Sequence, residues 1–122
     1  MSEKAIQSAV IPVAAIAGTV VQPLWRVPVG DSAYGGITIT GAYLLSSGAA
    51  TSQMQLTVGT ALGTATTGTI GTLNGTMVAN VQQAFTITTA YVASGSWIGL
   101  KTGAGGSLAT TNNVMLEYVW GR

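Results

Sequence analysis

Hydrophobic and polar residues alternate with a period of two along most of the chain. The alternation is clear in segments 35–45, 52–59, 83–92, 96–102 and 113–121, where the polar positions hold Thr, Gln or an isolated charge. Successive side chains of a β-strand point to opposite faces of a sheet, so this period is typical of strands. Turn sequences rich in Gly, Ser and Asn separate the segments, and no eleven-residue window shows a capped helical stripe. The pattern therefore predicts an all-β protein built as an antiparallel β-sandwich.

The apolar positions of these segments predict the core. In the first of them, Ile37, Ile39 and Tyr43 are expected to share one face, with Thr38 and Thr40 on the other. The remaining expected core positions are Met54, Leu56, Val58, Phe85, Ile87, Tyr91, Ile98, Leu100, Val114, Leu116, Tyr118 and Trp120.

The stretch GTALGTATTGTIGTLNGT at 59–76 is unusual, because twelve of its eighteen residues are Gly or Thr and none is charged. Predicted strands flank it, which indicates that it belongs to the fold. Thr favours strands, whereas Gly marks bends or a close approach of another backbone. We expect a loop at 59–68, a strand at 69–73 and a two-residue hairpin turn at Asn74 and Gly75.

The N-terminal part differs because it holds all three prolines, Pro12, Pro23 and Pro28. Proline is confined to edges and strand starts in sheets. The apolar run at 9–21 is too short for a membrane-spanning helix and lacks the basic start of a signal peptide, so we interpret it as an extended arm or a first strand. The predicted organisation is an arm over residues 1–22 and one sandwich domain over 23–122, with an edge strand holding Trp25 and Val27.

Composition excludes much of conventional active-site chemistry. The 122 residues are 48% hydrophobic and contain no His and no Cys, which removes His bases, thiol nucleophiles and the usual zinc ligands. The carboxylates are Glu3, Asp31 and Glu117, and nothing in their spacing indicates a catalytic pair. The four cations form no basic cluster, so nucleic acid is not an expected partner. Alternating strands would allow an outer-membrane barrel, but the absence of a credible signal peptide, the many short strands and the non-aromatic terminal Arg122 disfavour it, so a membrane is not an expected partner. We expect a protein that is not an enzyme and needs no cofactor or metal.

Only 6% of the residues are charged, and positions 32–100 hold no charge at all. A lone soluble domain normally carries a mixed, charged surface, so we expect copies or partners to cover much of this one. Exposed aromatic residues and apolar arm residues are the expected contacts. The alternative for Trp25 is a cap on the core at an edge strand, and the alternative for Trp97 is a plug at a loop end. The candidate interface residues are Ile11, Val13, Ile16, Val20, Trp25, Arg26, Tyr34 and Trp97.

The C-terminal segment TTAYVASGSWIGLKTGAGGSLATTNNVMLEYVWG resembles the closing hairpin of small jelly-roll domains in bacteriophage virion proteins. In both, a Thr-rich strand leads to a V-x-x-G turn, then to a strand, a Gly-rich loop and a final V-x-L-x-Y strand. The matching positions are Val92, Gly95, Ile98, Leu100, Val114, Leu116 and Tyr118. GGITITGAYLLSSGAATSQMQLTVGT is similar to the first half of such a sandwich, so the resemblance covers 35–121, although Ser96 stands where the family usually has Asp.

The resemblance implies a jelly-roll-like β-sandwich and a role in assembly. Such domains serve as capsid decoration (cement) proteins, head fibres or receptor-binding fibre tips, are commonly trimers and as a rule are not enzymes. We therefore expect a virion protein, assembled in the host cytoplasm, that contacts its own copies and the major capsid protein or another virion protein. The arm at 5–22 would add to a neighbour, so deleting residues 1–20 would leave the fold intact. The alternative is a receptor- or carbohydrate-binding module of a phage fibre, with Trp97, Tyr34 and Trp25 as the binding aromatics.

Overall fold

The computed structural model describes residues 5–13, 21–29, 35–48, 53–60, 68–73, 78–102 and 111–121. Within these ranges the chain forms strands and no helix long and apolar enough to cross a membrane. The strands are β1 (Gln7–Val13), β2 (Gln22–Arg26), β3 (Gly36–Ser46), β4 (Met54–Gly59), β5 (Gly68–Leu73), β6 (Gln83–Ala84), β7 (Thr86–Ile87), β8 (Tyr91–Ala93), β9 (Trp97–Thr102) and β10 (Asn112–Trp120).

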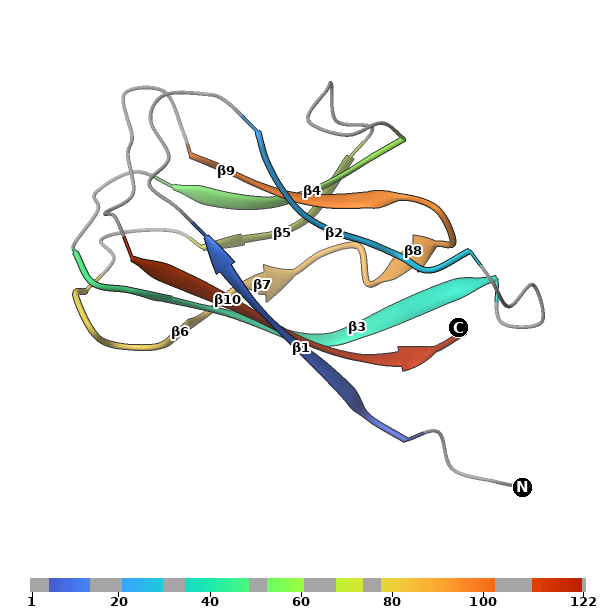
Figure 1. Ribbon diagram of the computed structural model, residues 1–122, viewed down its shortest axis with the longest axis horizontal. Helices are drawn as coiled ribbons and strands as arrows, with labels where there is room; N and C mark the ends of the chain where they lie inside the picture. The colour runs from blue at the N-terminus through green and yellow to red at the C-terminus, as the bar shows by residue number, and fades with distance from the viewer. Residues whose placement is uncertain are drawn as a thin grey trace.

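The strands form two antiparallel sheets that pack face to face, which confirms the predicted all-β sandwich (Figure 1). The first sheet has the order β1-β10-β3-β6, with β8 also paired to β3. The second sheet has the order β2-β9-β4-β5-β7. In Figure 1 the second sheet lies above the first, with β7 and β8 between them at one side.

Strands far apart in the sequence pair in a nested series. β1 pairs with β10, β2 with β9, β3 with β8 and β4 with β5, each antiparallel. The chain is thus arranged like one long hairpin. Its outermost strands, β1 and β10, pair in the first sheet, and the next two, β2 and β9, pair in the second. Both ends of the chain therefore contribute to each sheet, and the N-terminal strands are part of the sandwich.

The segment 83–93 joins the two sheets along one side. β6 and β8 pair with β3 in the first sheet, while β7 pairs with β5 in the second. Two further backbone hydrogen bonds join this segment to the sheets. The Phe85 amide donates to the Ala42 carbonyl of β3 at 2.8 Å, and the Thr88 amide donates to the Ile70 carbonyl of β5 at 2.8 Å. The predicted continuous strand over 83–92 is therefore wrong. The segment changes sheet twice, and this change satisfies backbone groups at the edges of β3 and β5.

The core lies between the sheets and consists of aliphatic residues with a few aromatic ones. Most of the predicted inward positions are confirmed, and Tyr118 is buried beside the ring of Trp25 at a centroid distance of 5.2 Å. The buried hydrophobic residues are Val13, Val27, Ile37, Ile39, Ala42, Leu44, Met54, Leu56, Ile70, Leu73, Phe85, Val92, Ile98, Leu100, Val114, Leu116 and Tyr118.

A β-bulge in β3 changes which residues of that strand face the core. Tyr118 pairs with Ile39 and Glu117 with Gly41, so Thr40 is the extra residue. A bulge shifts the inward–outward alternation by one residue. Tyr43 was predicted to share the core face of Ile39, and this is wrong: Ala42 and Leu44 are buried and Tyr43 points to the outer face.

The N-terminal segment is a first strand, which was one of the two interpretations of its sequence. β1 pairs with β10 over its whole length, from Gln7 opposite Tyr118 to Val13 opposite Asn112. Its inward residues Ile11 and Val13 pack on the core. Residues 7–13 therefore do not form an arm that leaves the domain, and deleting residues 1–20 is now expected to damage the fold. The predicted edge strand at Trp25 is confirmed as β2.

The Gly- and Thr-rich stretch contains β5, one residue longer at its start than the predicted strand at 69–73. Gly71 is required where β7 crosses: a Cβ there would lie 2.7 Å from the Thr86 carbonyl oxygen. Asn74 and Gly75 lie outside the described residues. The described strands on either side of them, β5 and β6, belong to different sheets.

Replacing Gly71 with alanine should destabilise the protein by about 1–3 kcal/mol, because the added methyl group must displace the backbone of β7. Gly68→Ala in the same strand is the control, since a Cβ there meets only Val58 Cγ1 at 3.6 Å, an ordinary contact. Urea unfolding of both variants measures the difference. Equal stabilities would contradict the close approach of β7 to β5.

Candidate contact surface on the outer face of the first sheet

The outer face of the first sheet carries a row of apolar side chains across three strands. Val10 of β1 is opposite Met115 of β10, and Met115 is opposite Tyr43 of β3. We call these three residues the outer apolar row. Tyr43 and Met115 alternate with buried neighbours, and Val10 alternates with partly buried neighbours that pack on the core, so all three side chains point away from the core. Val10 is 60% exposed, which is unusual for a large aliphatic residue in a strand centre.

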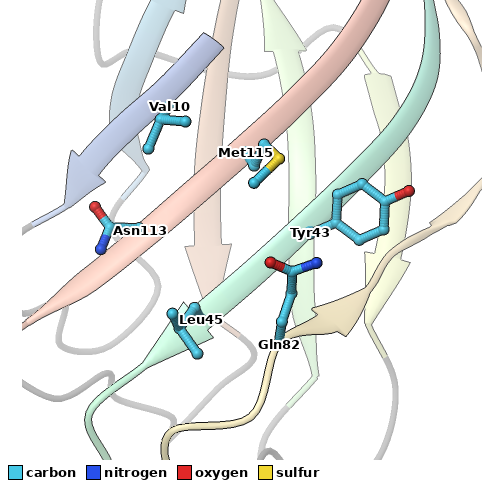
Figure 2. Close-up of a pocket in the computed structure, with 6 residues that line it drawn as sticks. All are labelled: Val10, Tyr43, Leu45, Gln82, Asn113 and Met115. Carbon is cyan, nitrogen blue, oxygen red and sulfur yellow. The ribbon is translucent and has the colours of Figure 1, made fainter. Parts of the chain in front are cut away.

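The outer apolar row lies along a shallow hollow of about 210 Å³. Figure 2 shows Met115 between Val10 and Tyr43, with the carboxamide of Gln82 across from the tyrosine ring. Asn113 and Leu45, which are opposite each other in the next row, complete the lining. The walls of the hollow are mainly apolar and carry no charged side chain.

Gly41 leaves room for the side chains of Glu117 and Tyr43, which meet beside the outer apolar row. A Cβ on Gly41 would lie 2.8 Å from the Glu117 Oε1 atom and 2.9 Å from the Tyr43 hydroxyl oxygen, so both side chains lie over this glycine. The Tyr43 hydroxyl donates a hydrogen bond to the Glu117 carboxylate. This bond, together with the negative charge of Glu117, raises the pKa of Tyr43 above its ordinary value of 10.0. The carboxylate beside the outer apolar row is thus already engaged within the chain.

The side chains of this surface are mainly apolar. Among the described residues there is no group of three or more His, Cys, Asp or Glu side chains that could hold a metal ion. The carboxylate at this surface, Glu117, is paired with the Tyr43 phenol and raises the pKa of that phenol. Exposed aliphatic, thioether and aromatic groups gain free energy by leaving water, which is the property of an interface.

The structure turns two of the predicted interface residues inward. Val13 is 5% exposed and Ile11 packs against the core, because β1 is a strand of the first sheet with these positions on its inner face. Their prediction as partner contacts is wrong. Ile16, Val20 and Tyr34 lie outside the described residues.

The other three predicted residues lie at one end of the second sheet. Trp25 is half-buried on the core against Tyr118, which agrees with its alternative as a cap. Arg26 is exposed, and its Nε atom donates to the Gly95 carbonyl at 3.3 Å. Trp97 is directly opposite Arg26 in the pairing of β2 with β9 and is half-buried. Arg26 and Trp97 are thus brought together, and both belong to the second sheet, whereas the outer apolar row belongs to the first.

Sequence reasoning missed the outer apolar row for two reasons. Tyr43 was assigned to the core, since a bulge at Thr40 leaves no mark in an alternating pattern. Val10 was placed in an arm, so its cross-strand neighbours were unknown. The usable signal was Met115, whose outward position follows from its alternation with the buried Val114 and Leu116.

No family model matches this chain, and neither a curated protein nor a solved structure shows significant similarity to it. What the protein does must therefore be argued from its own residues and their arrangement.

The pairing of Tyr43 with Glu117 predicts a late titration of this phenol. Because its folded pKa is raised above 10.0, the stability from the bond is fully present below pH 10 and is lost as pH rises through the raised value. Ultraviolet titration of tyrosinate should include a step above pH 10 that Tyr43→Phe removes. Glu117→Gln should lower this pKa toward the ordinary value. An unchanged titration in Glu117→Gln would contradict the pairing.

Proposed function

We propose that this protein is a structural component of a virus particle, of the capsid decoration (cement) type, which acts by associating with its own copies and with the shell. Its place would be the virion, and its partners would be the major capsid protein or another virion protein. The observation that carries the proposal is the outer apolar row, an exposed apolar surface on a sandwich that has almost no charge.

The nested strand pairing supports the same proposal. We interpret this pairing, with the ends of the chain paired in one sheet and the next strands paired in the other, as the winding of a jelly roll. This winding agrees with the jelly-roll virion proteins that segment 35–121 resembles. Under the proposal, the sandwich is a rigid body that presents its outer faces for assembly, and three copies is the expected unit.

The charge distribution also supports contact with other proteins. The described residues between β3 and Leu100 carry no charged side chain, so a large part of both sheets has no charge to oppose burial. Full burial of a single Val, Leu or Met side chain contributes about 1.5–3 kcal/mol. Val10 can contribute most of this amount on association, and the partly buried Leu45 and Met115 contribute less, against the entropy that association costs.

A carbohydrate-binding module of a phage fibre is the second candidate. The hollow favours it by one feature: the Tyr43 ring lies beside the carboxamide of Gln82, and a ring with a nearby amide can hold a neutral sugar. The aromatics first considered for this role are less favourable, because Trp25 packs on the core. Binding of any glycan that is lost in Tyr43→Ala and retained in Trp97→Ala would favour this candidate.

The virion role predicts that the protein is found on particles and attaches through the outer apolar row. Mass spectrometry of virus particles released from cells that carry this sequence should detect the chain. Met115→Lys should reduce its share in sedimented particles at least tenfold, because a buried unpaired ammonium group is costly. Thr86→Lys, on an exposed position of β7, should attach normally.

Circular dichroism should show both variants folded, since neither side chain is in the core. Absence of the unmodified chain from the particles would overturn the proposed function. Normal attachment of Met115→Lys would remove the outer apolar row from it.

A further inference from the structure

The free edge of β1 has the properties of a strand-addition site. We propose that β1 of one copy pairs antiparallel with β1 of a second copy, with Ser8 on the two-fold axis, so that the two first sheets join into one. The inference rests on the self-association in the proposed function and names the surface that makes it. A trimer formed through another surface is compatible with this contact, which would then join trimers in pairs.

β1 is held firmly on one side and unpaired on the other. It pairs with β10 along its whole length, and no other described strand pairs with it. The buried side-chain amide of Asn112 donates to the Val13 carbonyl at 3.2 Å and fixes the end of the strand. A strand fixed in this way presents its outer N–H and C=O groups as a ready template for another strand.

Pro12 shows which residues face the open edge. Proline has no N–H, so it fits a paired edge strand only where its nitrogen points away from the neighbour, and Pro12 is paired with Asn113. In an antiparallel strand the backbone groups of every second residue point to the same side. Ser8 and Val10 therefore present both N–H and C=O outward, and Pro12 presents only C=O.

This pattern selects one register. With Ser8 opposite Ser8 of the partner subunit, Ile6 lies opposite Val10 of the partner subunit, and Pro12 falls beyond the ladder. Ile6 is 67% exposed and Val10 is 60% exposed, the two highest values among the exposed large hydrophobic residues of the described chain. In this register Ile6 of each copy lies opposite Val10 of the other, so the contact forms twice. All outward N–H groups of positions 6, 8 and 10 are then paired. A register centred on Val10 would instead place Pro12 opposite Ser8 and lose a bond at each end.

The edge of the second sheet provides the contrast. β2 contains Pro23 near its centre, ends at the exposed Arg26, and has a register irregularity between Pro23 and Trp25. Proline, charge and irregular pairing are the usual protections of a sheet edge. Residues 5–11, which are the two residues before β1 and its first five, contain no proline and no charged side chain. The pairing of β1 with β10 has no register irregularity. The edge of β1 is therefore open over residues 5–11 and carries its proline, Pro12, after this stretch, whereas β2 carries proline and arginine within five residues.

Cross-linking tests the register, because the natural chain has no cysteine. Under mild oxidation Ser8→Cys should form a disulfide-linked dimer in high yield. Val10→Cys alone should not, since the two Val10 positions would be four residues or about 13 Å apart, beyond the reach of a disulfide. A mixture of Ile6→Cys and Val10→Cys chains should form the mixed dimer, and Thr40→Cys, exposed on β3, is the control for random collision.

Ser8→Pro, added to both chains of the mixed pair, tests the backbone ladder. This substitution removes an outward N–H but leaves the bonds to β10 in place and changes no residue of the outer apolar row. The fold should therefore be retained, and the yield of the mixed dimer should fall at least tenfold. Ser8→Cys dimers no more abundant than Thr40→Cys dimers, or efficient Val10→Cys homodimers, would overturn the inference.

These outcomes separate the inference from the proposed function. If the cross-links fail and the chain is present on virus particles, β1 is not the contact and the virion role stands. If the cross-links form and the chain is absent from particles, the strand pairing stands and the virion role falls.

Discussion

The bulge at Thr40 is the constraint on which the first sheet depends. β3 is eleven residues long and runs through the centre of that sheet, between β10 and the short strands β6 and β8. Without an extra residue, one half of the strand would place its apolar side chains on the wrong face. With it, Ile37 and Ile39 before the bulge and Leu44 after it all face the core. The same shift turns Tyr43 outward, so the core and the outer apolar row have a common cause.

The pairing of the remaining strands determines where the sandwich is closed and where it is open. Segment 83–93 alternates between the sheets on one side and uses the backbone groups of β3 and β5. The opposite side ends in β1 and β2, which are the edges of the two sheets. Closure on one side leaves only these two edges to protect, and the sequence protects β2 with proline and arginine. The charge-poor outer face and the open edge of β1 adjoin each other at Val10, so one region of the molecule concentrates the features of an interface.

The sequence predicted the fold class and most of the core because both rest on alternation, which is a local property. Ile98, Leu100, Val114 and Leu116 were placed correctly from their spacing alone. It could not predict what depends on pairing between distant strands. The bulge opposite Glu117 and Tyr118, the pairing of β6 before Phe85 and the partner of β1 are set by contacts across 39 (Leu44 to Gln83) to 111 (Gln7 to Tyr118) residues of chain. For the same reason the candidate surface was missed: Val10, Tyr43 and Met115 are neighbours only after β1, β3 and β10 have assembled.

The central claim is that this protein acts by contact with other protein surfaces, its own copies included. The most direct test is the native mass of the unmodified chain by light scattering over a wide range of concentration at moderate salt. The account predicts a stable mass that is a multiple of the 12.3 kDa chain. A chain that stays monomeric at all concentrations would contradict it, because Thr and Gly alone would then keep the exposed apolar surface in water.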